Sequence, residues 1–138
     1  SVLATDPFVD PAEAQFPLVD LDTLLRTSDI VSLHVPAQDD DRTLLDADRL
    51  TLLREGAMLI NTARGGLVDE AALAAGLRKG RLAFAGLDAF ATEPYVGELR
   101  ELDNVLLTPH LGSNTRETRR AMEQEAARNL AAALGLWT

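Results

Sequence analysis

Short apolar segments that alternate with helical patterns limit most strongly how this chain can fold. Four of these segments lack the polar alternation of a half-exposed strand: residues 30–35, 57–62, 82–87 and 105–108. Nearly continuous apolar runs are typical of parallel strands that are covered by helices on both faces. Residues 2–5 predict a further short strand, which ends before Pro7. The pattern therefore predicts an α/β fold built on a parallel sheet.

Helical patterns fill the segments between the apolar runs. Asp20 and Asp46 precede two of them and can accept hydrogen bonds from the first-turn N–H groups, and a third helical pattern runs from Asp69 to Lys79. Asn114, with Glu117 three residues later, resembles a capping box and predicts the start of a last helix. On one face that helix would place Met122, Ala126, Leu130, Ala133 and Leu134.

Length and composition exclude several classes of partner. The 138 residues suffice for one domain at most, and 13 basic against 22 acidic side chains give a formal net charge of −9. This charge argues against nucleic acid and against an anionic membrane surface as partners. The chain has no cysteine, shows no signal-peptide pattern, and has apolar runs too short to cross a bilayer. We therefore expect a cytoplasmic protein without a metal site.

Each predicted strand is followed by a residue that can react or hold a ligand: Asp6, His34, Arg64, Asp88 and His110. In open parallel sheets the ligand binds at the edge formed by the carboxyl ends of the strands. We therefore expect these five residues to converge on one edge, and this convergence is more specific than any single residue.

Arg64 lies at the strand end that is followed by two glycines. Gly65 and Gly66 follow it, and because neither has a Cβ atom the chain can turn sharply and a ligand can approach the backbone. The guanidinium group of an arginine presents a planar fork of donors that suits a carboxylate or a phosphate. Taken alone, the stretch is equally compatible with an ordinary strand–turn–helix joint that carries a solvated arginine.

A glycine-rich loop that might be expected in such a fold is missing. A dinucleotide-binding fold carries Gly-x-Gly-x-x-Gly after its first strand, with an acidic residue about 20 positions later. The nine glycines of this chain form no such pattern. Asp6 suits the acidic position, so we expect the glycine-rich loop to precede Ser1 and the sequence to begin inside the fold.

Five motifs, in order, resemble the NAD-binding domain of the D-isomer-specific 2-hydroxyacid dehydrogenases. They are Asp-Pro-Phe at 6–8, His-Val-Pro at 34–36, Asn-Thr-Ala-Arg-Gly-Gly at 61–66, Leu-Asp-Ala-Phe with Glu-Pro within 87–94, and Thr-Pro-His-Leu-Gly at 108–112. The resemblance covers essentially the whole chain. It implies a Rossmann-type doubly wound parallel sheet that is incomplete at the N-terminus. Residues 1–138 would form a partial NAD-binding domain, without the glycine-rich loop and without the family's substrate domain.

The resemblance also implies catalytic roles for three residues in hydride transfer between NAD and a D-2-hydroxy acid or 2-oxo acid. Arg64 would bind the substrate carboxylate and help to polarise the carbonyl group. His110 would be the acid and base, because imidazole titrates near neutral pH. Glu93 would be its carboxylate partner. A glutamate at this position argues against the formate dehydrogenase branch, which has glutamine.

The cofactor contacts implied by the resemblance extend along the same edge. Asp6 would bind the adenosine ribose hydroxyls and repel the 2′-phosphate of NADP, and Asp88 would face the nicotinamide amide. His34 is more simply a structural strand-end residue whose backbone approaches the adenine. The other positions that would line the cofactor are Pro36, Thr62, Ala63, Gly112 and Ser113, together with Arg64 and His110.

Other interpretations stay open. Corepressors of the same family sense NADH without turnover and keep the arginine, glutamate and histidine, and an inactive fragment is a third interpretation. In the common strand order 3-2-1-4-5-6 the first strand is central, so its absence would leave two apolar strand edges unpaired. A lone piece should then be unstable, domain-swapped or accompanied by further polypeptide, whereas the complete protein is expected to be a homodimer.

Two further groups of residues receive structural interpretations. Asp39, Asp40 and Asp41 are interpreted as a solvated loop, and Met122 and Trp137 as core or interface residues.

Overall fold

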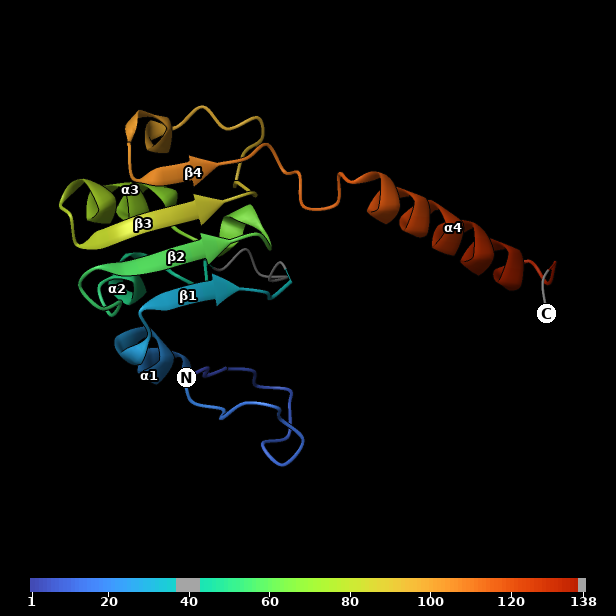
Figure 1. The fold of residues 1–138 in the computed structure, drawn as a ribbon, viewed down its shortest axis with the longest axis horizontal. Coiled ribbons are helices and arrows are strands. Elements are labelled where there is room, and N and C mark those ends of the chain that lie inside the picture. Colours follow the sequence, from blue (N-terminus) through green and yellow to red (C-terminus); the bar gives the residue numbers. More distant parts are fainter. Residues whose placement is uncertain (37–42, 137–138) are drawn as a thin grey trace.

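The computed structural model describes residues 1–36 and 43–136 and is built on a parallel sheet. Its strands lie in the order β1-β2-β3-β4. Their bounds are Ile30–Leu33 for β1, Ala57–Asn61 for β2, Leu82–Leu87 for β3 and Val105–Leu107 for β4. All three neighbouring pairs are parallel, so the four carboxyl ends meet at one edge (Figure 1). The predicted parallel α/β fold is confirmed.

Three helices begin where the sequence predicted. They are α1 at Leu21–Thr27, α2 at Ala47–Leu50 and α3 at Glu70–Arg78. Asp20, Asp46 and Asp69 cap them, each accepting a hydrogen bond from a backbone N–H in the first turn. Two 3₁₀ helices lie in segments that were expected to be turns or loops: η1 at Gly65–Leu67 and η2 at Glu98–Glu101.

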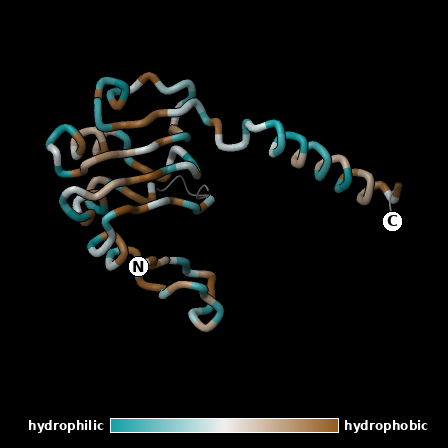
Figure 2. Tube along the Cα trace, in the orientation of Figure 1, coloured by the Kyte–Doolittle hydropathy of each residue, from teal (hydrophilic) through white to brown (hydrophobic). Residues whose placement is uncertain are grey.

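The core is almost entirely aliphatic, as a chain with 4% aromatic residues requires. The apolar strands run through the body of the fold with polar segments at its periphery (Figure 2). Leucines dominate the largest fully buried side chains, and one polar residue is buried with them: Leu25, Leu45, Leu53, Leu59, Leu67, Leu73, Leu82, Leu99 and Asn61. The buried polar residue lies at the end of β2, where the candidate site begins.

The first predicted strand is wrong as a regular strand. Ala4 forms a single parallel bridge with Leu18, through hydrogen bonds of 3.0 Å to the Pro17 carbonyl and 2.9 Å from the Val19 N–H. The segment does not join the sheet, and a hollow of about 510 Å³ separates it from β1. Within the described residues β1 pairs only with β2, and Ile30 is 61% exposed.

The last helix, α4 at Arg116–Ala133, projects away from the sheet (Figure 1). No residue of α4 is buried, and Met122 is 55% exposed, so its prediction as a core residue is wrong. The reason is that the described residues place no element against this helix, whose apolar face therefore lacks a neighbour. An interface role for Met122 stays a prediction.

The predicted start of α4 is wrong by one residue. Thr115, not Asn114, is the N-cap: its hydroxyl accepts the Thr118 N–H at 3.1 Å. Asn114 instead accepts a hydrogen bond from the Arg119 side chain at 3.2 Å. Trp137 and the aspartates at 39–41 lie outside the described residues. None of the described helices combines the length and the apolar character that a membrane span requires.

Candidate active site at the carboxyl edge of the sheet

Glu93 and His110, 17 residues apart in the sequence, form a pair beyond the ends of β3 and β4. The imidazole Nδ1 lies 3.1 Å from each carboxylate oxygen. The Phe90 N–H donates a 3.1 Å hydrogen bond to the same carboxylate. The Phe90 N–H first, and then the His110 side chain, lower the pKa of Glu93 from its ordinary value. The structure thus brings together the two residues that were predicted to be an acid/base group and its carboxylate partner.

The backbone at His110 adopts an unusual conformation. Its φ is +53°, in the left-handed region that residues other than glycine seldom occupy. Holding such a residue there costs on the order of 1 kcal/mol, and surrounding contacts must stabilise it. Strained residues of this kind cluster at functional sites.

Asp88 provides those contacts. Its carboxylate accepts hydrogen bonds from the Thr108 hydroxyl, the Leu111 N–H at 2.7 Å and the Gly112 N–H at 2.8 Å. Burial alone would raise the pKa of Asp88, but these three hydrogen bonds and the charge of His110 together lower it. Asp88 therefore holds the loop that carries His110. Its predicted contact with the nicotinamide amide stays a prediction.

The side chain of Asn61 stabilises the Arg64 turn through hydrogen bonds to its backbone, a role that was not predicted from the sequence. Asn61 is fully buried; its amide donates to the Arg64 carbonyl at 2.8 Å, and its oxygen accepts the Ala63 N–H at 3.1 Å. A polar residue at the end of an apolar run was the available signal. Arg64 is exposed at the sheet edge, and one guanidinium nitrogen donates to the Ala63 carbonyl at 2.7 Å.

The two glycines after Arg64 have different surroundings. A Cβ atom on Gly65 would lie 1.8 Å from the Phe90 carbonyl carbon and 2.3 Å from the Ala91 nitrogen. A Cβ atom on Gly66 would meet nothing within 4 Å. Gly65 is therefore required because the Arg64 turn packs against the loop that leads to Glu93, rather than because a ligand approaches there.

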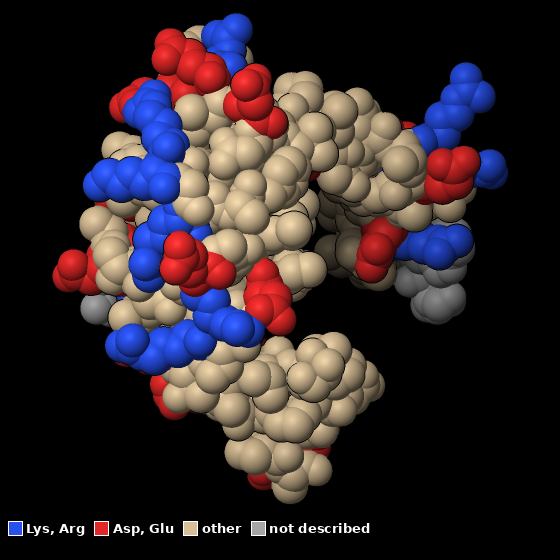
Figure 3. Space-filling view, turned by 60° about the vertical axis from the view of Figure 1, so that its left-hand side comes forward, with Lys and Arg blue, Asp and Glu red and all other residues tan. Residues whose placement is uncertain are grey.

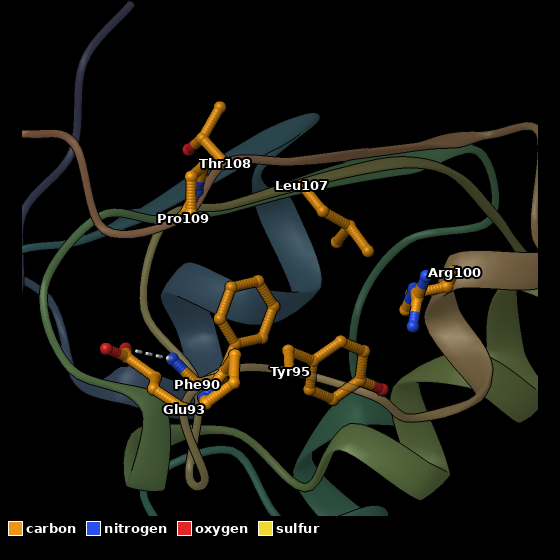
Figure 4. Close-up of a pocket in the computed structure, with 8 residues that line it drawn as sticks. Phe90, Glu93, Tyr95, Arg100, Leu107, Thr108 and Pro109 are labelled. Atoms are coloured by element: carbon orange, nitrogen blue, oxygen red, sulfur yellow. Dashed lines mark hydrogen bonds between the residues drawn. The ribbon is translucent and has the colours of Figure 1, made fainter.

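A hollow of about 510 Å³ is lined by Glu93 and by Pro109, the residue before His110 (Figure 4). The rings of Phe90 and Tyr95 stack in it with centroids 4.5 Å apart and an interplanar angle of 21°. Burial raises the pKa of Tyr95, the Leu99 N–H opposes this, and nearby glutamates add to the rise. Glu93 and Arg100 line the hollow from different elements, and sequence reasoning assigned no role to Tyr95 or Arg100.

The residues predicted to hold the adenosine half of the cofactor lie beside β1. Asp6 and His34 both line the other hollow of about 510 Å³, which separates residues 2–5 from β1. The Asp6 carboxylate is exposed and accepts the Phe8 N–H at 2.9 Å, and His34 Nε2 lies 2.9 Å from the Ser32 hydroxyl. An exposed carboxylate next to a hollow suits donation from ribose hydroxyls.

The other predicted cofactor positions follow the ends of further strands. Pro36 and Thr62 are exposed, and Ala63 is half-buried. Gly112 and Ser113 come directly after the His110 loop and are both exposed. All of these positions follow strands whose carboxyl ends share one edge of the parallel sheet.

The charges of the surface are mixed rather than segregated on the face shown in Figure 3, where lysine and arginine side chains alternate with acidic ones. Among the described residues, no group of three or more histidine, aspartate or glutamate side chains is arranged to hold a metal ion.

Comparison with known proteins decides the family. The profile of the D-isomer specific 2-hydroxyacid dehydrogenases, NAD binding domain, matches residues 1–112. The chain belongs to this family. NAD is accordingly the cofactor of this domain, and the Rossmann-type fold predicted from the sequence is confirmed.

Relatives and solved structures give the same result. A hydroxypyruvate reductase from Thermotoga maritima is 37% identical over 139 residues, which cover 98% of this chain and 45% of that protein. A glyoxylate reductase from Thermococcus litoralis is 47% identical over 115 residues, covering 83% of this chain and 35% of that protein. The NAD-complexed structure of a D-isomer specific 2-hydroxyacid dehydrogenase from Lactobacillus delbrueckii ssp. bulgaricus superposes with a TM-score of 0.83 at 34% identity, covering 96% of this chain and 46% of that one. The chain thus spans less than half the length of these proteins.

Proposed function

We propose that the protein interconverts a 2-oxo acid and the corresponding D-2-hydroxy acid, with NAD as the hydride carrier. The observation that carries the proposal is the Glu93–His110 pair, held in place at the sheet edge where Arg64 is also exposed. An acid/base group and a carboxylate-binding cation are what this reaction needs from the protein, because the cofactor supplies only the hydride.

Each of the three side chains has a definite task in reduction. The Arg64 guanidinium binds the substrate carboxylate through two N–H groups and polarises the carbonyl oxygen. Because Nδ1 of His110 faces Glu93, the other ring nitrogen, Nε2, is the one that gives its proton to the developing alkoxide. Glu93 fixes the ring orientation and favours the protonated imidazole. In oxidation the neutral Nε2 takes the proton back.

The cofactor is held along the same edge. Asp6 would accept hydrogen bonds from the adenosine ribose hydroxyls, and its charge disfavours NADP. Around the rest of the cofactor we place the residues that follow the strands: His34, Pro36, Thr62, Ala63, Asp88, Gly112 and Ser113. Glyoxylate and hydroxypyruvate are our first candidate substrates, because proteins named for their reduction are among the relatives. Location in the cytoplasm and assembly as a homodimer stay predictions.

The test is turnover of NADH by the complete gene product with glyoxylate, hydroxypyruvate, pyruvate and 3-phosphohydroxypyruvate. Replacing His110 by Gln should lower kcat by at least about 100-fold, the usual contribution of a general acid, with NADH binding retained. If the parent binds NADH but reduces none of these acids, the proposal fails in favour of an NADH-sensing scaffold. If it turns over an acid equally well after His110→Gln, the role of His110 is wrong.

A further inference from the structure

Glu70, the first residue of α3, reaches across to the loop after β3. Its carboxylate accepts the Ala91 N–H at 2.8 Å, a contact between residues 21 positions apart. The side chain is half-buried. Helix capping does not explain this contact, because Asp69 already caps α3 by accepting the Ala72 N–H at 2.9 Å. The contact therefore serves the loop rather than the helix.

The residue that Glu70 binds is directly linked to the acid/base pair. Ala91 follows Phe90, whose N–H donates to Glu93, which in turn contacts His110. Three contacts thus connect the start of α3 to the imidazole ring: Glu70 with Ala91, Phe90 with Glu93, and Glu93 with His110.

The same peptide is held from the side of Arg64. Gly65 packs so closely on the Phe90–Ala91 peptide that no Cβ atom would fit between them. Gly65 directly follows Arg64 and begins η1, and Glu70 comes three residues after η1 ends. The peptide is therefore clamped by two groups that belong to the segment carrying Arg64.

We propose that Glu70 is a positioning residue: by binding Ala91 it sets Glu93 against His110 and keeps this pair in register with Arg64. The inference rests on the proposed reaction, in which carboxylate binding and proton transfer act on the same substrate. It makes Glu70 important through the hydrogen bond that it accepts, not through its negative charge. Glutamine keeps an acceptor oxygen of the same reach, whereas alanine removes it.

The experiment compares Glu70→Ala, Glu70→Gln, Glu93→Gln and the double variant Glu70→Ala/Glu93→Gln in the complete gene product. We expect Glu70→Ala to lower kcat by about tenfold, as a displaced catalytic group does, with KM for NADH within about twofold. Glu70→Gln should keep kcat within about twofold of the parent. The double variant should be no worse than Glu93→Gln, because Glu70 is proposed to act on His110 through Glu93.

A readout independent of turnover is the NMR titration of the Glu93 carboxyl group. The pKa of Glu93 is lowered first by the Phe90 N–H, so loosening the loop in Glu70→Ala should move that titration toward the ordinary range, and Glu70→Gln should leave it in place. Asp88 and His110 are the charged groups that also act on Glu93. Because Asp88 and His110 are unchanged in both Glu70 variants, a difference between the two Glu93 titrations reflects the substitution at Glu70.

Asp22→Ala is the matched control, because Asp22 is likewise an acidic residue in the first turn of a helix, α1. This substitution should leave kcat unchanged. The proposal is overturned if Glu70→Gln loses as much kcat as Glu70→Ala, or if the Glu70 and Glu93 effects are additive. A parent without turnover contradicts the proposed function alone; the Glu93 titration then decides the positioning role by itself.

Discussion

The carboxyl edge of the sheet has an inner and an outer layer that differ in exposure and in task. The inner layer consists of Asn61, Gly65 and Asp88, all buried, with the polar side chains fully hydrogen-bonded. The outer layer consists of Arg64, Glu93 and His110, all exposed. The inner groups hold the backbone from which the outer groups project. Changes in the inner layer should therefore reduce stability, and changes in the outer layer should reduce activity.

The largest effect is expected in the inner layer, from Gly65→Ala. Its Cβ atom would lie 1.8 Å from a backbone carbon, which no rotamer change can relieve. We expect the free energy of unfolding to fall by about 3 kcal/mol or more, measured by urea denaturation. Gly66→Ala is the control and should change it by less than about 0.5 kcal/mol, because nothing lies within 4 Å. Equal effects of the two substitutions would contradict the packing described for Gly65.

Asp88→Asn should have the next largest effect, about 2 kcal/mol, because it weakens charge-assisted hydrogen bonds that hold the His110 loop. The pKa of Asp88 is lowered in the folded state. Its stabilising contribution is therefore complete above the unfolded pKa of about 4 and is lost as the pH falls through the lower folded pKa. Denaturation of both proteins between pH 2 and pH 7 should show the difference shrinking only at the acidic end. A difference independent of pH would mean that the charge of Asp88 contributes nothing.

In the outer layer, Arg64→Lys should lower kcat/KM by at least about tenfold, or about 1.4 kcal/mol, since lysine keeps the charge but loses the bidentate fork. The melting temperature should stay unchanged, because the exposed guanidinium group supports no buried contact. Arg26→Lys in the last turn of α1 is the control for the loss of a guanidinium group elsewhere. An Arg64→Lys variant as active as the parent with every 2-oxo acid would refute the assignment of Arg64.

The smallest effect is a displacement of pH dependence. Nδ1 of His110 lies 3.1 Å from the Glu93 carboxylate, and a carboxylate at this distance stabilises a positive charge on an imidazole ring. Glu93→Gln removes the carboxylate charge, so reduction should be lost at a lower pH than in the parent. The acid limb of oxidation should move in the same direction. The measurement is kcat/KM against pH in both directions, and limbs that do not move would show that the two side chains are uncoupled.

Prediction from the sequence succeeded where the pattern is local. Apolar runs identified the four strands, the aspartates at 20 and 46 identified two helix starts, and the helical pattern at 69–79 identified a third helix. It failed at Asn114, because Asn114 and Thr115 can both cap a helix and the backbone conformation selects between them. It failed for residues 2–5, because a strand exists only where a neighbouring strand accepts its hydrogen bonds. The spacing of apolar residues in α4 likewise predicted an apolar helix face, but it did not predict which element packs against that face.

The parallel α/β fold, the family and the order of the predicted ligand-facing residues could all be predicted from the amino-acid sequence, because periodicity, capping and motifs are each read within a few positions. Which of those residues touch one another depends on the tertiary structure. It placed Glu93 on His110, bound Asp88 to the loop that holds His110 in a left-handed conformation, and brought Glu70 to Ala91. The physical reason is that hydrogen bonds between loops depend on distances set by strand register and packing, which no local pattern in the chain encodes.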